Sequence, residues 1–120
     1  GVSSNIIIDK NRLFFVARDG FFYSYDIDNN KSKRIVKVDN NPSVDKYLTK
    51  NSVKFKDYIM FCSDRGSLFV YDTVNDFYQF VKIADINVSL LASPMVINND
   101  VYLMDIRSNS YKISDFSLSQ

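Results

Sequence analysis

A chain of 120 residues with 46% hydrophobic and 24% charged residues has the composition of one ordinary globular domain. The formal net charge of +1 provides no broad field for nucleic acid or an anionic membrane, and no apolar run approaches the roughly 18 residues of a membrane span. The absence of histidine excludes Ser-His-Asp and Cys-His catalysis and every zinc site that needs imidazole, and one cysteine cannot form an internal disulfide.

Short extended runs separated by turns make up the first third of the chain. We expect strands at 5–9, 12–18, 21–27 and 33–38, because these runs are β-rich and either mostly apolar or alternating. In the turn Arg18-Asp19-Gly20, the glycine supplies the positive φ that a tight hairpin requires. The polar residues 28–32 predict another turn, so the segment is expected to form four antiparallel strands.

The same order of runs and turns returns further along the chain. FVARDGFFYSYD at 15–26 and FCSDRGSLFVYD at 61–72 share Phe, Gly, Tyr and Asp at matching positions, 46 residues apart. We therefore expect strands at 52–55, 58–63, 67–72 and 77–84. A weaker third copy spans 93–114, at an offset of 42 residues from the second. The stretches 42–50 and 85–92 join the copies, and a short helical turn at 43–48 fits the first of them.

Four short antiparallel strands per repeat are typical of a β-propeller blade, so the predicted fold class is all-β with about three propeller-type blades. The blades are predicted at about 4–41, 48–85 and 91–120, within a single partial propeller domain that covers 1–120. The aromatic residues expected to fill the space between neighbouring blades are Phe14, Phe15, Phe21, Phe22, Phe61 and Phe69. Propellers close with roughly four to eight blades, so either further blades lie outside this sequence or copies associate to cover open faces.

Several short motifs within these copies resemble the PQQ-like β-propeller repeat, in which S-P-x-V and V-Y precede D-G-x-L-Y and a closing Asp. The matching residues are Ser93-Pro94-Met95-Val96 with Val101-Tyr102, Asp19-Gly20-Phe21-Phe22-Tyr23, Arg65-Gly66-Ser67-Leu68-Phe69, Tyr25-Asp26 and Tyr71-Asp72. The resemblance covers nearly the whole chain. The tryptophan that commonly closes each repeat of this family is absent, which favours the non-catalytic, BamB-type members over the quinoprotein dehydrogenases.

The resemblance implies a non-enzymatic protein–protein interaction scaffold, in the periplasm or at the outer membrane, with a role in outer-membrane protein assembly. Its protein partners would bind exposed loops or strand edges, above all at 42–50 and 85–92, and copies would self-associate to cover open blade faces. Neither nucleic acid nor a membrane span is expected, and no catalytic, cofactor-binding or metal-binding residue is assigned. Two alternatives stay open: a fragment of a PQQ-dependent quinoprotein dehydrogenase, and a self-associating luminal stress-sensor domain.

Two local features look like chemical sites. Cys62-Ser63-Asp64 places a nucleophile beside an acid, but Cys62 aligns with Val16 and no histidine exists to activate it, so a buried core thiol is expected. Asp26-Ile27-Asp28-Asn29-Asn30 resembles the start of a calcium loop. Lys31 and Lys37 occupy the positions where an EF-hand loop needs Gly and Glu, which favours an Asx-rich turn.

A basic cluster and a sequon complete the set of candidate sites. The cluster consists of Lys31, Lys33, Arg34 and Lys37, in the expected outer strand of the first copy. Strict alternation would place Lys33, Ile35 and Lys37 on one side and Arg34, Val36 and Val38 on the other. This pattern favours a solvated edge strand that resists pairing with other chains over a nucleic-acid or lipid surface. Asn87-Val88-Ser89 fits the N-glycosylation sequon, whose use depends on a secretory location.

Overall fold

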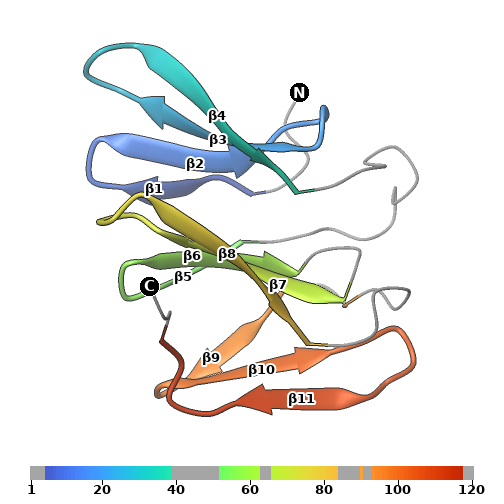
Figure 1. Ribbon diagram of the computed structural model, residues 1–120. Coiled ribbons are helices and arrows are strands. Elements are labelled where there is room, and N and C mark those ends of the chain that lie inside the picture. Colours follow the sequence, from blue (N-terminus) through green and yellow to red (C-terminus); the bar gives the residue numbers. More distant parts are fainter. Residues whose placement is uncertain (1–4, 39–51, 63–65, 84–89, 91–92, 118–120) are drawn as a thin grey trace.

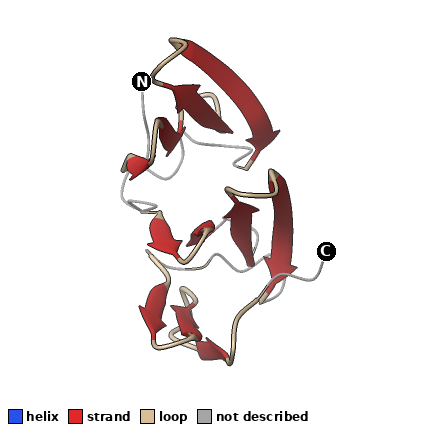
Figure 2. Ribbon diagram, turned by 90° about the vertical axis from the view of Figure 1, so that its left-hand side faces the viewer, coloured by secondary structure: helices blue, strands red, loops and turns tan. Residues whose placement is uncertain are grey.

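The computed structural model describes residues 5–38, 52–62, 66–83, 90 and 93–117, and the regular structure within these ranges is entirely β. Figure 1 shows three antiparallel sheets stacked one upon another in chain order, and Figure 2 shows the same stack after a quarter turn. The stack is open, with the first and third sheets at its two ends. This arrangement confirms the predicted all-β fold built from blade-like sheets.

Each sheet, or blade, is an antiparallel meander whose strand order follows the chain. The first blade contains β1 (Ile7–Asp9), β2 (Arg12–Val16), β3 (Phe21–Asp26) and β4 (Lys31–Lys37). The second contains β5 (Val53–Phe55), β6 (Tyr58–Cys62), β7 (Ser67–Asp72) and β8 (Phe77–Lys82). Within the described residues the third contains β9 (Met95–Ile97), β10 (Asp100–Met104) and β11 (Ser110–Ile113). The helical turn expected at 43–48 lies outside the described ranges.

Left-handed backbone conformations recur at equivalent turns of the three blades. Positive φ occurs after the first strand of each blade and again after the second, at Lys10, Lys56 and Asn98 and at Gly20, Gly66 and Ser108. Within both sets the spacing is 46 residues and then 42, which equals the spacing of the sequence copies. The sequence copies are therefore structural copies. Ser108 holds with a Cβ atom a conformation that glycine adopts without steric cost in the first two blades.

Two apolar cores lie between the blades. Successive side chains of a strand point to opposite faces, so a blade in the middle of a stack can be covered on both faces. The core between the first and second blades contains Phe14, Val16, Phe22, Val38, Ile59, Phe61, Phe69 and Tyr71. The core between the second and third contains Met60, Cys62, Leu68, Val70, Leu90, Val101, Leu103 and Phe116. Because the second blade contributes to both, its strands β6 and β7 are almost continuously apolar.

Directional polar contacts fix the first blade on the second. The Arg12 guanidinium donates to the Thr73 carbonyl oxygen at 2.6 Å. The Asn5 side chain donates to the Ser52 carbonyl at 3.0 Å and accepts from the Ser52 amide at 2.6 Å. Hydrogen bonds require a defined distance and angle, whereas apolar contacts do not. These bonds therefore set how the two sheets are placed along each other, while the apolar core holds them together.

Strand β4 departs from the alternation expected for it. The register of β3 and β4 shifts between Phe22 and Tyr23, which leaves Ile35 as an extra residue in β4. Ile35 packs against the core between the blades, while Arg34 and Lys37 are paired with residues of the opposite face. The prediction that Arg34 and Lys37 point to opposite sides is therefore wrong, because the bulge inserts one residue into the alternation.

Candidate protein-binding face of the first blade

The first blade has one face that points away from the second blade, and no other described part of the chain packs on it (Figure 1). Cross-strand pairing places six apolar or aromatic side chains on it, and we call this set the first-blade face: Ile8, Leu13, Phe15, Phe21, Tyr23 and Tyr25. Five of them are half-buried by their neighbours within the sheet, and Ile8 is 67% exposed. Phe15 and Tyr23 stack with ring centres 5.6 Å apart. The result is an aromatic surface that none of the described residues outside the first blade covers.

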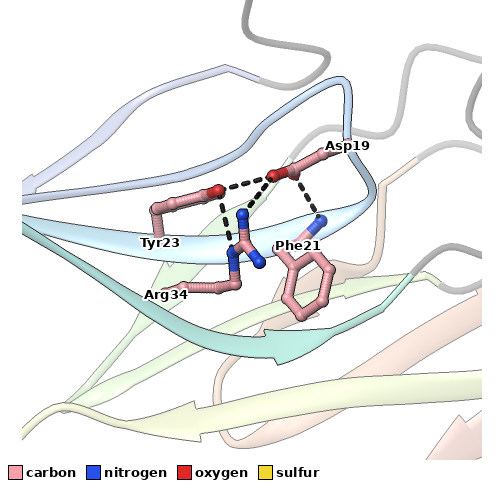
Figure 3. Close-up of polar contacts among 4 residues, drawn as sticks. All are labelled: Asp19, Phe21, Tyr23 and Arg34. Carbon is pink, nitrogen blue, oxygen red and sulfur yellow. Dashed lines mark hydrogen bonds and ion pairs between the residues drawn. The ribbon is translucent and has the colours of Figure 1, made fainter.

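A polar cluster crosses this face where the β2–β3 turn approaches β4 (Figure 3). The Asp19 carboxylate accepts hydrogen bonds from the Phe21 amide at 3.0 Å, from the Tyr23 hydroxyl and from the Arg34 guanidinium at 3.4 Å. Arg34 Nε also donates to the Tyr23 hydroxyl oxygen at 3.1 Å. The guanidinium carbon lies 4.4 Å from the centre of the Phe21 ring, within the range of a cation–π contact. The cluster therefore holds the Arg34 guanidinium close to the aromatic rings of this face.

The electrostatics of the cluster keep both of its ionisable ends charged. The hydrogen bond from Tyr23, followed by that from the Phe21 amide and the charge of Arg34, lowers the pKa of Asp19. The hydrogen bond to Tyr23 and the charges around it raise the pKa of Arg34. The Arg34 and Asp19 side chains are 57% and 38% exposed, so their ion pair adds little to stability. What the cluster provides is a positioned guanidinium among aromatic rings, a combination enriched in protein-binding surfaces.

The equivalent face of the second blade is less polar. Tyr23 aligns with Phe69, and the partner of Tyr23 across the sheet is Arg34, whereas the partner of Phe69 is Phe80. Phe69 is fully buried by the first blade, and its ring centre lies 5.2 Å from that of Phe80. On the first-blade face, a tyrosine therefore stands in place of one phenylalanine and an arginine in place of the other. Such groups are compatible with a surface that contacts water when it is unoccupied.

Sequence reasoning assigned part of this face to the core. Phe14, Phe22, Phe61 and Phe69 do lie between the first two blades, as expected. Phe15 and Phe21, assigned to the same space, lie on the first-blade face instead. The signal that separates them was present in the sequence, because neighbouring residues of one strand point to opposite sides of its sheet.

The expected Asx-rich turn is present at Asp26 and recurs at two other turns. Asp26 accepts hydrogen bonds from the amides of Asp28 and Asn29 at 3.0 and 3.2 Å and from the Asn29 side chain at 2.8 Å. Asp72 makes the equivalent bonds in the second blade, and Asp105 makes a similar set in the third. Each of these carboxylates thus accepts hydrogen bonds from donors within its own turn. Within the described residues, no group of three or more potential metal ligands occurs.

Asp105 is the most enclosed of the three turn carboxylates, with 1% of its surface exposed. It accepts from the Arg107 and Asn109 amides at 2.8 and 2.9 Å, from the Asn109 side chain at 3.0 Å and from the Tyr111 hydroxyl at 2.8 Å. Burial opposes the charged form, but these hydrogen bonds outweigh it and lower the pKa of Asp105 to about 2. The sequence comparison did not single out Asp105, because the aligned positions hold Ala17 and Ser63.

We expect Asp105 to make the stability of the protein depend on pH in the acid range. Its folded-state pKa lies below the ordinary value of 3.8, so its contribution is complete above about pH 4 and is lost as the pH falls toward about 2. The Asp105→Asn variant should melt at a lower temperature than the wild type at about pH 7, and the difference should shrink at about pH 2.5. A difference between the two melting temperatures that stays constant on acidification would contradict this assignment.

Cys62 is a fully buried residue of β6, in the core between the second and third blades. Ser63 and Asp64, the other members of the suspected nucleophile motif, lie outside the described residues. Since a thiol reagent reaches a buried side chain only after local opening, we expect labelling of Cys62 in the native protein to be at least ~100-fold slower than in urea. Equal rates of thiol modification, measured by absorbance with and without denaturant, would show that the β6 side of this core is accessible.

The basic cluster of β4 is divided between two surroundings. Lys33 reaches across to the second blade, where its ammonium lies 3.1 Å from the Asp76 carboxylate. Arg34 and Lys37 lie over the Phe21 ring instead, and the Lys37 ammonium is 5.9 Å from the ring centre. The charges therefore do not gather on one surface. This division agrees with the interpretation of a solvated outer strand, apart from the bulge.

Other sequence features fall largely outside what the structure describes. The connections at 42–50 and 85–92, apart from the buried Leu90, and the sequon Asn87-Val88-Ser89 all lie there. In the described ranges, no helix combines the length and the apolar character that crossing a membrane requires.

Comparison with known proteins provides support for the fold. No protein-family model matches the sequence, and no curated protein matches it. Among solved structures, the crystal structure of the computationally designed Ika4 protein is similar, with a TM-score of 0.57 and 14% sequence identity. The match covers 90% of this chain and 62% of the designed one, so this chain spans less than two thirds of that protein's length. At this identity the likeness concerns the fold alone.

Proposed function

We propose that this chain is a non-enzymatic, protein-binding scaffold of the PQQ-like, BamB-type propeller kind, and that it works in outer-membrane protein assembly in the bacterial envelope. The observation that carries the binding part of the proposal is the first-blade face. It combines stacked aromatic rings with a guanidinium that hydrogen bonds to Tyr23 and Asp19 already hold in place. The class of scaffold and its location follow from the repeat motifs that resemble the PQQ-like family.

The physical argument for a protein partner is the exposed apolar area that this face leaves. An uncovered sheet face with six apolar or aromatic side chains is larger than the isolated hydrophobic residues normal on a protein surface. Burial of such area contributes roughly 25 cal/mol per Å² before the costs of association are subtracted. Exposed loops and strand edges provide further contacts around the face. A scaffold of this kind needs no catalytic group.

A site-specific photo-crosslinker tests the proposal. Placed at Phe15, within the first-blade face, it should form covalent adducts with protein in envelope extracts under illumination. The same group placed at Val74, a 64% exposed turn residue away from this face, should form few. In a protein that carries both the crosslinker at Phe15 and the Arg34→Glu substitution, fewer adducts should form, because the substitution reverses the charge that lies over the Phe21 ring. Absence of any protein adduct at Phe15, or equal adducts at both positions, would count against a binding face here.

The enzymatic alternative predicts a different response. A fragment of a quinoprotein dehydrogenase should bind PQQ together with Ca²⁺, and binding to the native state would raise the melting temperature. The scaffold proposal predicts an unchanged melting curve when PQQ and Ca²⁺ are added together. A reproducible rise would favour the dehydrogenase assignment.

A further inference from the structure

The two contacts between blades follow one rule. In each, the earlier blade packs one of its faces, which we call its donating face, on the next blade in the chain. The face of the later blade that accepts this contact is called its receiving face. The first contact buries Phe14 and Phe22 of the first blade against Phe61 and Phe69 of the second. The second buries Leu68 and Cys62 of the second blade against Val101 and Leu103 of the third. Leu68 aligns with Phe22, and Leu103 aligns with Phe61, so the same repeat positions meet both times.

This rule shows which of the two kinds of face lies at each end of the stack. The first-blade face carries Phe15 and Tyr23, which align with Phe61 and Phe69 of the second blade. It is therefore a face of the receiving kind. The face of the third blade that points away from the second is of the opposite, donating kind, because its Tyr102 aligns with Met60.

The donating face of the third blade is also apolar and exposed. We call its four large side chains the third-blade face: Met95, Ile97, Tyr102 and Met104. Met95, Ile97 and Met104 are 61%, 50% and 44% exposed. Lys112 lies on the same side, with its ammonium 5.8 Å from the Tyr102 ring centre and 3.7 Å from the Asp100 carboxylate. Methionine and tyrosine, like the Tyr and Arg of the first-blade face, are enriched in protein interfaces.

We propose that the partner of the first-blade face is the third-blade face of a second copy of this chain. The proposal rests on the proposed function, because it names the protein that the binding face takes. Within one chain, a donating face packs on a receiving face at both contacts between blades. The proposed contact between two copies has the same arrangement. The two faces lie at opposite ends of the stack, so each copy can use both at once (Figure 1). Association is head to tail and therefore heterologous.

Blade number limits how such an assembly closes. For the 120-residue chain, two copies bring six of the described sheets, a number within the roughly four to eight blades with which propellers close. We therefore expect two copies of this chain to form a dimer with two equal contacts. Ring closure buries both end faces of both copies, which an open chain of copies cannot do. The polar replacements at Tyr23 and Arg34 suit a contact that forms between separate molecules, because both groups are hydrogen-bonded before association.

Sedimentation velocity on the purified 120-residue chain and three variants tests the proposal. The wild type should sediment as a dimer. Phe15→Lys alters the receiving face and Tyr102→Lys the donating face, so each variant alone should be monomeric at the same concentration. An equimolar mixture should regain a dimer, since one variant retains the donating face and the other the receiving face. This mixed dimer has one contact instead of two and should need a higher concentration. Val74→Lys, a substitution in an exposed turn, should remain dimeric.

Each other outcome overturns the proposal. A wild type that is monomeric at about 0.1 mM, where even a weak interface is populated, would exclude self-association. Loss of the dimer in Phe15→Lys but not in Tyr102→Lys would show a symmetric contact of two first-blade faces. Circular dichroism shows whether each variant folds. If Phe15→Lys does not fold, the sedimentation of the wild type and of Tyr102→Lys still tests whether the third-blade face forms the contact. A monomeric wild type with intact crosslinking of another protein at Phe15 would overturn this inference alone, whereas loss of both would overturn the proposed function too.

Discussion

The Phe22→Ala variant should lose about 3–5 kcal/mol of its free energy of unfolding, one of the two largest effects that we expect from any single substitution. Phe22 has no exposed surface, and its ring centre lies 5.1 Å from that of Phe69 and 5.4 Å from that of Tyr71. Removing the ring leaves a cavity in the core between the first two blades. Because small domains are stable by only about 5–15 kcal/mol, the loss should be evident as a lower urea midpoint.

Phe80→Ala provides the matched control for this prediction. Phe80 is also a strand phenylalanine in contact with Phe69, but it is 40% exposed and belongs to the outer strand β8. Because the ring is partly exposed, its removal loses less hydrophobic free energy and leaves a smaller cavity. The expected loss in the free energy of unfolding is therefore about 1 kcal/mol. Equal losses in the two variants would indicate that the contact between the blades is no better packed than the sheet's outer edge.

The strand order and the turns could be read from the sequence because they depend on local chemistry. Gly20 and Gly66 mark hairpins in the first two copies, and the 42-residue offset of the third copy places Ser108 at the equivalent position. All three residues have a positive φ. Asp26 and Asp72 close the third strands and then organise the following turns through their own side chains. Repetition made these local signals stronger, since each occurred two or three times.

Features that depend on the relation between strands were not readable in the same way. The bulge at Ile35 results from the pairing of β4 with β3, and one inserted residue reversed the expected side of Lys37. Sequence comparison likewise could not reveal Asp105, because it has no carboxylate counterpart in the other copies. Its spacing to Asn109 and Tyr111 is a usable signal only once the turn is known.

The exposure of the first-blade face could not be predicted from the sequence, for a related reason. Leu13, Phe15 and Tyr23 have the same apolar pattern as residues buried in the second blade, so composition predicts a core. Whether a sheet face is covered depends on which blade follows or precedes it in space. Arg34 is a residue that could have distinguished the two faces, because it lies opposite Tyr23 at the place where the second blade has the apolar Phe80 opposite Phe69.

Leu68→Ala should destabilise the third blade selectively, which makes it the counterpart of Phe22→Ala. The two residues occupy the same position of the repeat, but Leu68 packs in the core between the second and third blades. It is fully buried there, so the local loss should be about 2–5 kcal/mol. In the described residues the third blade has three short strands, and this core is its contact with the rest of the protein.

Hydrogen exchange measures where the two substitutions act. In stacked repeats, stability is approximately the sum of the stabilities of the units and of their contacts, so weakening one contact frees the terminal unit that depends on it. In Leu68→Ala, amides of β10 and β11 should exchange at least ~30-fold faster, while those of β2 and β3 should change little. Phe22→Ala should show the reverse, with β2 and β3 accelerated. If Leu68→Ala accelerated exchange equally in all three blades, the stack would unfold as one unit and the blades would not be separable modules.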